Sequence, residues 1–298
     1  MANFNQIGLD LQSVMKRTYA NLLYNSSFYN FLNEAYIGEI RTTGTPVIEV
    51  LKTQAPTIST RDYVEMTSAK TPGLVAYKPV KVDLTELKLD YSFRIPVTIM
   101  GSNIMNAIDD AIRLKDSEIA VKVDTYGFDK MADTITGDRT GGKTSKDTGT
   151  TYTWNPANNE GYIKALNTLK SKLFNEKIYD NYRLGLEAEE YGNFVSALTS
   201  VLKFETLAGV EGVDRGQVAR AYGVDTFPIA TSVLTNSEKG YFAHPVGVVG
   251  DAFFDSVVEY AGNYPGFPGY YVIEGNFLFG AEVVRPEAIV KLVASASV

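Results

Sequence analysis

The feature that most constrains the fold is a long run of helical periodicity over about residues 102–135. Apolar side chains recur there at steps of three and four residues, namely Ile104, Ile108, Ala111, Ile112, Ile119, Val123, Met131 and Ile135. Ser102 or Asn103 can cap the first turn. A helix of about 34 residues would be roughly 50 Å long, whereas globular helices average about 11 or 12 residues. The fold must therefore accommodate one unusually long helix, which Gly127 can bend without ending.

The segments before this helix have a different character. Residues 1–39 begin with an amphipathic stripe, which predicts a helix followed by a short helical piece near residues 28–36. Residues 40–96 instead alternate apolar and polar side chains, and Pro72 and Gly73 supply a turn between two extended arms. The alternation is clearest at Val80, Val82, Leu84, Leu87, Leu89, Tyr91, Phe93 and Ile95. A hairpin this long with few core residues is marginal alone, so we expect it to lie against another surface.

The second half of the chain combines helices and short strands without one regular repeat. Residues 162–177 form an amphipathic pattern, with Ile163, Leu166, Leu169 and Leu173 on one side. Residues 181–198 predict a short strand, a turn and the start of a helix, and further short strands are predicted near residues 218–230, 241–251, 269–276 and 281–295. The carboxyl-terminal apolar residues are predicted to be buried, namely Val283, Val284, Ile289, Val290 and Leu292. This mixture predicts an α+β protein.

Composition excludes several kinds of site. The chain has no cysteine and a single histidine, His244, so thiolate metal sites, cysteine nucleophiles and histidine clusters cannot be built from one chain. The net charge is −7 without a long basic run, which argues against strong sequence-independent DNA binding. No stretch approaches the roughly 20 apolar residues of a membrane helix, and the amino terminus is unlike a signal peptide. We expect a soluble protein made in the cytoplasm, with no cofactor, metal or catalytic residues.

One short pattern points to nucleotide binding. Gly137, Gly142, Lys143 and Thr144 have the spacing G-x-x-x-x-G-K-T of a phosphate-binding loop. Such a loop needs a buried strand before it and a helix after it, so that the helix amino terminus faces the phosphates. Here a helix end precedes the pattern, and a polar, threonine- and glycine-rich stretch follows it. We therefore interpret residues 136–151 as a linker and keep a P-loop nucleotide-binding protein as an alternative.

His244 and the pair Asp109 and Asp110 are candidates for catalytic residues. His244 is followed directly by proline and has no second histidine or cysteine as a partner. We interpret it as a turn or half-buried residue rather than a base. Asp109 and Asp110 would point about 100° apart on a helix, so the two carboxylates do not converge on one site.

A second acidic group and the aromatic residues are candidates for other kinds of site. Glu187, Glu189 and Glu190 are interpreted as a solvated face rather than an acid–base site or metal site. Trp154 and the 19 tyrosines are dispersed and are not interleaved with basic residues. Core and interface packing is therefore expected for them, rather than stacking on nucleic acid.

The order of the segments resembles the major capsid protein of tailed bacteriophages, the Hong Kong 97 fold family, over nearly the full chain. "ALNTLKSKLFNEKIYDNYRLGLEAEEYGNFVSAL" (residues 165–198) resembles the family's passage from helix to strand to helix. "GQVARAYGVDTFPIATSVL" (216–234) resembles part of its axial domain. "GNFLFGAEVVRPEAIVKL" (275–292) resembles its closing hairpin. These are loose phrases, and their joint order makes the match specific.

The resemblance implies a division of the chain. Residues 1–39 would be an amino-terminal arm and residues 40–98 an extended hairpin loop. Residues 99–178 would be a peripheral domain that contains the long spine helix. Residues 179–274 would be an axial domain, and residues 275–298 the return strand of the peripheral domain.

The resemblance also implies a structural protein rather than an enzyme. Its subunits would self-assemble as hexamers and pentamers into an icosahedral shell enclosing phage double-stranded DNA, located in the virion after assembly in the host cytoplasm. The acidic balance would limit adhesion to that DNA. A portal and a separate scaffolding protein would be partners, because the long scaffolding segment of many relatives does not precede the arm here.

Two further possibilities come with the family. An encapsulin-type shell, which encloses an enzyme instead of DNA, shares the fold and is the alternative function. Some relatives join lysine and asparagine side chains of neighbouring subunits, with a buried carboxylate as catalyst. Lys70 and Asn276 would be the partners here.

Overall fold

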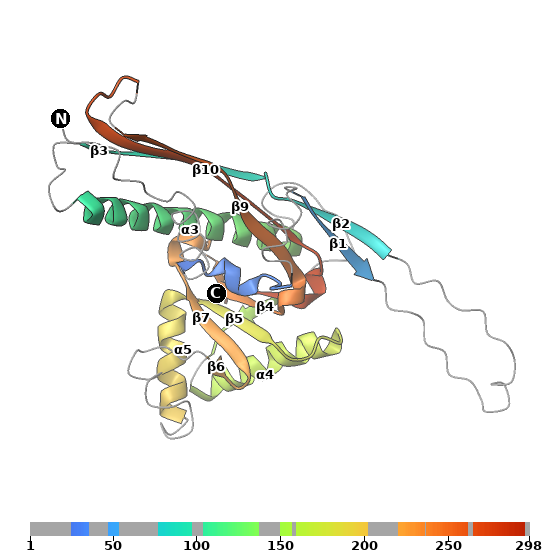
Figure 1. The fold of residues 1–298 in the computed structure, drawn as a ribbon. Helices are drawn as coiled ribbons and strands as arrows, with labels where there is room; N and C mark the ends of the chain where they lie inside the picture. Colours follow the sequence, from blue (N-terminus) through green and yellow to red (C-terminus); the bar gives the residue numbers. More distant parts are fainter. Residues whose placement is uncertain are drawn as a thin grey trace, which may run out of the picture.

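The computed structural model describes residues 25–35, 47–53, 77–96, 104–136, 150–156, 159–201, 220–235, 237–261 and 265–295. These residues form two packed units and a projecting hairpin (Figure 1). In the first unit a long helix lies along a three-stranded sheet, and in the second unit two helices pack on a six-stranded sheet. The mixture of segregated helices and sheets confirms the predicted α+β class.

The first unit is built on helix α3 (Ile104–Thr136), which is the predicted long helix and continues through Gly127. Its sheet consists of β3 (Leu87–Pro96), β10 (Tyr270–Val283) and β9 (Val248–Ala261), paired antiparallel in the order β3-β10-β9. The predicted apolar positions of α3 that face the core are at most 6% exposed, namely Ile112, Ile119, Val123, Met131 and Ile135. The helical stripe therefore buries itself against the apolar face of the sheet.

The hairpin consists of β1 (Val47–Thr53) and β2 (Tyr77–Asp83), which pair antiparallel with Val50 opposite Val80. Paired extended arms were predicted over residues 40–98, and β1 and β2 agree with that prediction. Residues 87–96 of the same predicted loop instead form β3, which pairs with β10. The base of the hairpin buries an apolar cluster that also includes residues from the first unit: Ile48, Val50, Val82, Leu84, Val249 and Val284. The predicted turn at Pro72 and Gly73 lies outside the described residues.

The second unit holds six strands in the order β4-β11-β8-β5-β7-β6. Their bounds are β4 (Thr150–Trp154), β11 (Ile289–Ala294), β8 (Glu238–Ala243), β5 (Tyr182–Glu187), β7 (Val224–Ile229) and β6 (Arg220–Ala221). Helices α4 (Asn159–Asn175) and α5 (Ala188–Val201) complete the unit. The β5–β7 and β4–β11 pairs are parallel, and the β5–β8, β8–β11 and β6–β7 pairs are antiparallel.

Both faces of the six-stranded sheet are buried at its central strands β5, β8 and β11. Tyr241 and Ala243 on β8 belong to the core of the first unit, whereas Phe242 between them belongs to the core under α4 and α5. Strands that are buried on both faces have continuous apolar runs instead of alternation. This is why the second half of the sequence lacks a clear two-residue period. The predicted burial of the carboxyl-terminal residues is confirmed, since Val283, Val284, Ile289, Val290 and Leu292 are at most 8% exposed.

The observed elements differ from the predicted segments at one boundary and in the grouping of one helix. The boundary between residues 274 and 275 falls inside β10, which pairs with β9 on both sides of that point. Helix α4 was grouped with α3, but its buried residues lie in the second core with α5 and β5. The peripheral and axial division itself stays a prediction.

Candidate functional site

His244, the one histidine of the chain, has a structural role. It precedes the short 3-10 helix Pro245–Gly247, and its Nδ1 accepts a hydrogen bond of 3.1 Å from the Val246 backbone N–H. Burial lowers the pKa of His244, and the nearby Arg183 guanidinium lowers it further. A neutral imidazole that caps a turn agrees with the interpretation of His244 as a half-buried turn residue.

The prediction of a solvated face for the acidic group at residues 187–190 is wrong for two of its members. Glu187 Oε2 lies 2.6 Å from Lys239 Nζ, and the Glu187 side chain is only 12% exposed. Glu190 accepts a hydrogen bond of 3.2 Å from the Trp154 indole N–H and lies 3.9 Å from Lys239 Nζ. Glu189 remains exposed. The error arose because Lys239, 52 residues away, reaches these carboxylates only after β8 pairs with β5.

Two ion pairs are buried inside the protein. Lys291 Nζ on β11 lies 2.8 Å from Glu238 Oε1 on β8, and the two side chains are 9% and 0% exposed. On α3, Lys115 Nζ lies 3.3 Å from Asp116 Oδ1, and the Lys115 ammonium lies 4.1 Å from the centroid of the Tyr91 ring. Burial lowers the pKa of Lys115 and raises that of Tyr91 to about 12. The Lys291–Glu238 pair joins β11 to β8, and the Lys115 ammonium joins α3 to β3 through the Tyr91 ring.

The other candidates lie only partly within the described residues. Lys70 and the P-loop-like Gly137–Thr144 stretch lie outside the described residues, as do the Asp109 side chain and its relation to Asp110. Asn276 on β10 is paired with Asp90 on β3, and its amide nitrogen can donate to Asp90 Oδ1 at 3.0 Å. Within the described part of the chain, no three histidine, aspartate or glutamate side chains are arranged to hold a metal ion.

A shallow pocket of about 300 Å³ lies beside the carboxyl end of α4. Its lining consists of Lys170, Ser171, Phe174, Asn175 and Tyr182. The Lys170 ammonium donates to the Tyr222 carbonyl oxygen, and burial lowers the pKa of Lys170. The hydrogen bond to the Tyr222 carbonyl oxygen therefore fixes the Lys170 ammonium at the edge of this pocket.

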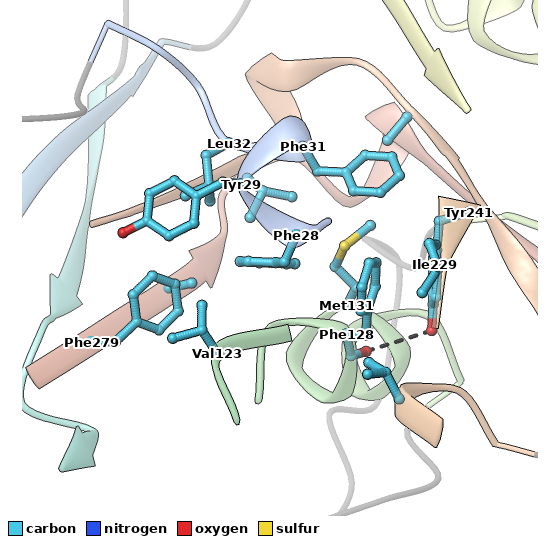
Figure 2. Close-up of a cluster of buried hydrophobic side chains, with 14 of the residues drawn as sticks. Phe28, Tyr29, Phe31, Leu32, Val123, Phe128, Met131, Ile229, Tyr241 and Phe279 are labelled. Carbon is cyan, nitrogen blue, oxygen red and sulfur yellow. Dashed lines mark hydrogen bonds between the residues drawn. The ribbon is translucent and has the colours of Figure 1, made fainter. Parts of the chain in front are cut away.

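The most specific arrangement is the insertion of an amino-terminal segment between the two units. The segment contains the 3-10 helix η2 (Phe28–Phe31) and is surrounded by rings from both units (Figure 2). Phe28 packs edge-to-face on Phe128 of α3 at 5.5 Å and on Phe279 of β10 at 6.2 Å. Phe31 packs on Phe227 of β7 at 5.0 Å. The segment thus contributes apolar side chains to the contact between the two units.

Polar contacts hold the same segment in place. The Asp124 carboxylate of α3 accepts hydrogen bonds from Ser26 Oγ, from the Ser27 backbone N–H at 3.0 Å and from the Phe28 backbone N–H at 2.9 Å. It therefore satisfies the free N–H groups at the start of η2. Burial raises the pKa of Asp124 to about 6, against the opposing effect of these hydrogen bonds. Arg183 of β5 donates to the Asn30 carbonyl oxygen from the other unit.

Sequence reasoning found the short helical piece near residue 28 but missed its insertion. The available signal was the density of aromatic residues in "SSFYNFLN", residues 26–33, between polar neighbours. Phe28, Phe31 and Leu32 are fully buried. Three such side chains in one short turn cannot be shielded by that turn itself, so they must enter the core of another element.

Similarity to known proteins appears in structure and not in sequence. No protein-family model and no curated protein matches the sequence. The capsid structure of the cyanophage P-SCSP1u matches with a TM-score of 0.59 and 12% identity, over 85% of this chain and 84% of that chain. The chain has the fold of a phage capsid protein. A structure from Mycobacterium phage Che8 matches with a TM-score of 0.57 and 15% identity, over 90% of both chains.

The same capsid fold occurs in a particle from an archaeon. The crystal structure of a virus-like particle from Pyrococcus furiosus matches with a TM-score of 0.55 and 12% identity, over 95% of this chain and 99% of that chain. At this level of identity the likeness lies in the arrangement of the elements and not in particular side chains. A capsid fold therefore does not by itself assign a function to any single residue.

Proposed function

We propose that this chain is a major capsid protein, which self-assembles into an icosahedral shell enclosing phage double-stranded DNA. The observation that carries the proposal is the extent of the structural match, which includes 85% of this chain and 84% of a cyanophage capsid chain. The proposed role is structural and not enzymatic.

The proposed mechanism is geometric association. The β1–β2 hairpin points away from the two packed units in Figure 1, and a two-stranded sheet has little stability of its own. Such an arm gains stability by lying on a partner through edge hydrogen bonds and apolar burial. In the proposed shell each hairpin lies on a neighbouring subunit of the same hexamer or pentamer.

Exposed aromatic side chains support further contacts between subunits. Phe174 in the last turn of α4 is 59% exposed and Tyr179 is 52% exposed, and their rings pack edge-to-face at 4.8 Å. The Arg94 guanidinium on β3 lies 4.1 Å from the centroid of the Phe267 ring, which is in the turn between β9 and β10. Aromatic residues and arginine are enriched in protein interfaces.

The remaining features of the proposal follow from the same role. The net charge of −7 limits adhesion of the inner surface to DNA, which suits enclosure without sequence-specific binding. No helix in the described ranges is long and apolar enough to cross a membrane. We place the assembled protein in the virion, after assembly in the host cytoplasm, with a portal and a separate scaffolding protein as partners.

A second candidate is an encapsulin-type shell. It is favoured by the match to the virus-like particle from Pyrococcus furiosus, which includes 99% of that chain. The contents of shells isolated from the producing cells separate the two functions. Nuclease-protected double-stranded DNA supports the capsid, and a single enclosed enzyme without DNA supports the alternative.

The hairpin provides the test of assembly. We expect that replacing residues 68–74 with a short glycine–serine turn leaves a soluble protein with a nearly unchanged circular dichroism spectrum. The variant should form no closed shells, or only malformed ones, in electron micrographs. The matched control is the same glycine–serine replacement at residues 138–144, the P-loop-like stretch, which should assemble normally. Normal closed shells from the hairpin variant would refute the proposed intersubunit role of the hairpin.

A further inference from the structure

The hairpin joins the body of the protein through a connector of three residues, 84–86, between β2 and β3. The first connector residue, Leu84, is fully buried in the apolar cluster at the hairpin base. The backbone of β10 packs directly against this point, since a Cβ atom added at Gly280 would lie 2.0 Å from the Asp83 carbonyl oxygen. One end of the connector is thus anchored by apolar packing.

The other end of the connector is anchored by charge. Glu86 Oε2 accepts a hydrogen bond from the Tyr126 hydroxyl and lies 2.5 Å from Lys130 Nζ. Tyr126 and Lys130 are four residues apart on α3, so their side chains emerge from the same face of the helix. Lys130 Nζ also lies 3.7 Å from Glu282 Oε2 on β10. The lysine therefore faces carboxylates from both the connector and the central strand.

The protonation states at neutral pH favour this contact. Burial acts to raise the pKa of Glu86, but hydrogen bonds from Lys130 and Tyr126 outweigh it and hold the pKa below its ordinary value. Burial raises the pKa of Tyr126, and its hydrogen bond to Glu86 raises it further. At neutral pH the Tyr126 hydroxyl therefore stays protonated and donates a hydrogen bond to the ionised Glu86 carboxylate.

We propose that Glu86, Tyr126 and Lys130 form a latch that fixes the direction of the β1–β2 hairpin relative to helix α3. Apolar packing at the hairpin base holds the hairpin on the body, but it is non-directional and does not by itself select one angle. A second, directional anchor two residues further along the chain removes that rotation. The consequence for assembly rests on the proposed function: the latch presents each hairpin at the one angle at which it meets the next subunit.

The direction of the hairpin can be measured by electron paramagnetic resonance, because the chain contains no cysteine that would bind the label unintentionally. Spin labels are attached through Lys81→Cys on β2 and Lys122→Cys on α3, both at exposed positions. Labelled subunits are diluted with unlabelled chain and measured at concentrations below those that give shells. In the parent we expect one narrow distance distribution between the labels.

Two latch variants are compared with a matched control. Glu86→Gln removes the charge of the connector carboxylate, and Tyr126→Phe combined with Lys130→Met removes both donors while keeping apolar bulk. Both variants should lose the narrow distance population and show a broad one. Glu118→Gln, which removes an exposed charge from the same helix, should keep the parent distribution. Narrow parent-like distributions in both latch variants would overturn the latch.

Shell formation is scored separately by electron microscopy of the unlabelled proteins. Latch variants that give open or malformed particles, beside closed particles from the parent and from Glu118→Gln, support the role of the latch in assembly. Closed particles of parent shape from variants with broad distance distributions would overturn that role. Failure of the parent to form shells even with the proposed scaffolding protein present would refute the proposed function, and the distance measurement would still decide whether the latch exists.

Discussion

Replacing Gly127 with alanine should destabilise this protein, although the same change stabilises most helices. In a helix interior, glycine is about 1 kcal/mol less favourable than alanine, because its backbone loses more freedom. Gly127 lies within α3, but a Cβ atom there would be 2.4 Å from two carbons of the Phe28 ring. Carbon atoms in contact are normally about 3.5–4.0 Å apart. The glycine therefore provides the space for the Phe28 ring.

The size of the stability loss depends on how far the Phe28 ring can move away from the added methyl group. Phe28 would have to move by about 1 Å, but Asp124 holds the Ser27 and Phe28 backbone N–H groups on the same face of α3. Forcing an extra methyl group into such a core costs about 1–3 kcal/mol, and expelling the ring would lose about 1.5–3 kcal/mol of burial. After the gain in helix propensity of about 1 kcal/mol, we expect Gly127→Ala to lower the free energy of unfolding by up to about 2 kcal/mol.

Gly192 provides the matched control within the same chain. It lies inside α5, and a Cβ atom added there would meet nothing within 4 Å. Gly192→Ala should therefore raise the free energy of unfolding by about 0.5–1 kcal/mol. The assay is denaturant unfolding of unassembled subunits, followed by far-ultraviolet circular dichroism and by fluorescence of Trp154, which is buried in the second unit. Because the Phe28 segment contacts both units, both signals should shift together in Gly127→Ala.

A double-mutant cycle identifies Phe28 as the cause. Phe28→Leu should cost less stability in the Gly127→Ala background than in the parent, because the smaller side chain relieves the clash. Stabilisation by Gly127→Ala equal to that by Gly192→Ala would refute the reasoning, and with it the packed insertion of the segment at this point of α3.

Two further predictions concern buried charges. Lys291→Met should lower the free energy of unfolding in denaturant by about 3–5 kcal/mol, because Glu238 would remain buried without its cation. The double variant Lys291→Met/Glu238→Met should recover much of this loss. Equal losses in the single and double variants would contradict this prediction. For Asp124, the folded-state pKa of about 6 exceeds the ordinary value of 3.8, so its stabilising effect is complete below about pH 3.8 and is lost as the pH rises through 6. From pH 5 to pH 7.5 the parent should therefore lose about 1.4 kcal/mol relative to Asp124→Asn, and parallel stability curves for the two proteins would exclude the shifted pKa.

The candidate site shows where reasoning from sequence was limited. The structural interpretation of His244 needed only the proline after it and the absence of a second histidine, and its capping contact agrees with it. The interpretation of Glu187 and Glu190 depended on knowing which residue lies opposite them. Their partner Lys239 is on another strand, and nothing in the local sequence selects it.

The sequence by itself determined the elements whose pattern is local. The stripe of α3, the amphipathic α4 and the apolar β11 follow from spacing along the chain, since a helix or strand shows each side chain to a fixed face. Only the tertiary structure decided which faces meet. The burial of Phe28 beside Gly127 and the contact of Glu86 with Lys130 join residues far apart in the chain. Such contacts depend on the packing of the whole core, because no local preference specifies a partner at long range.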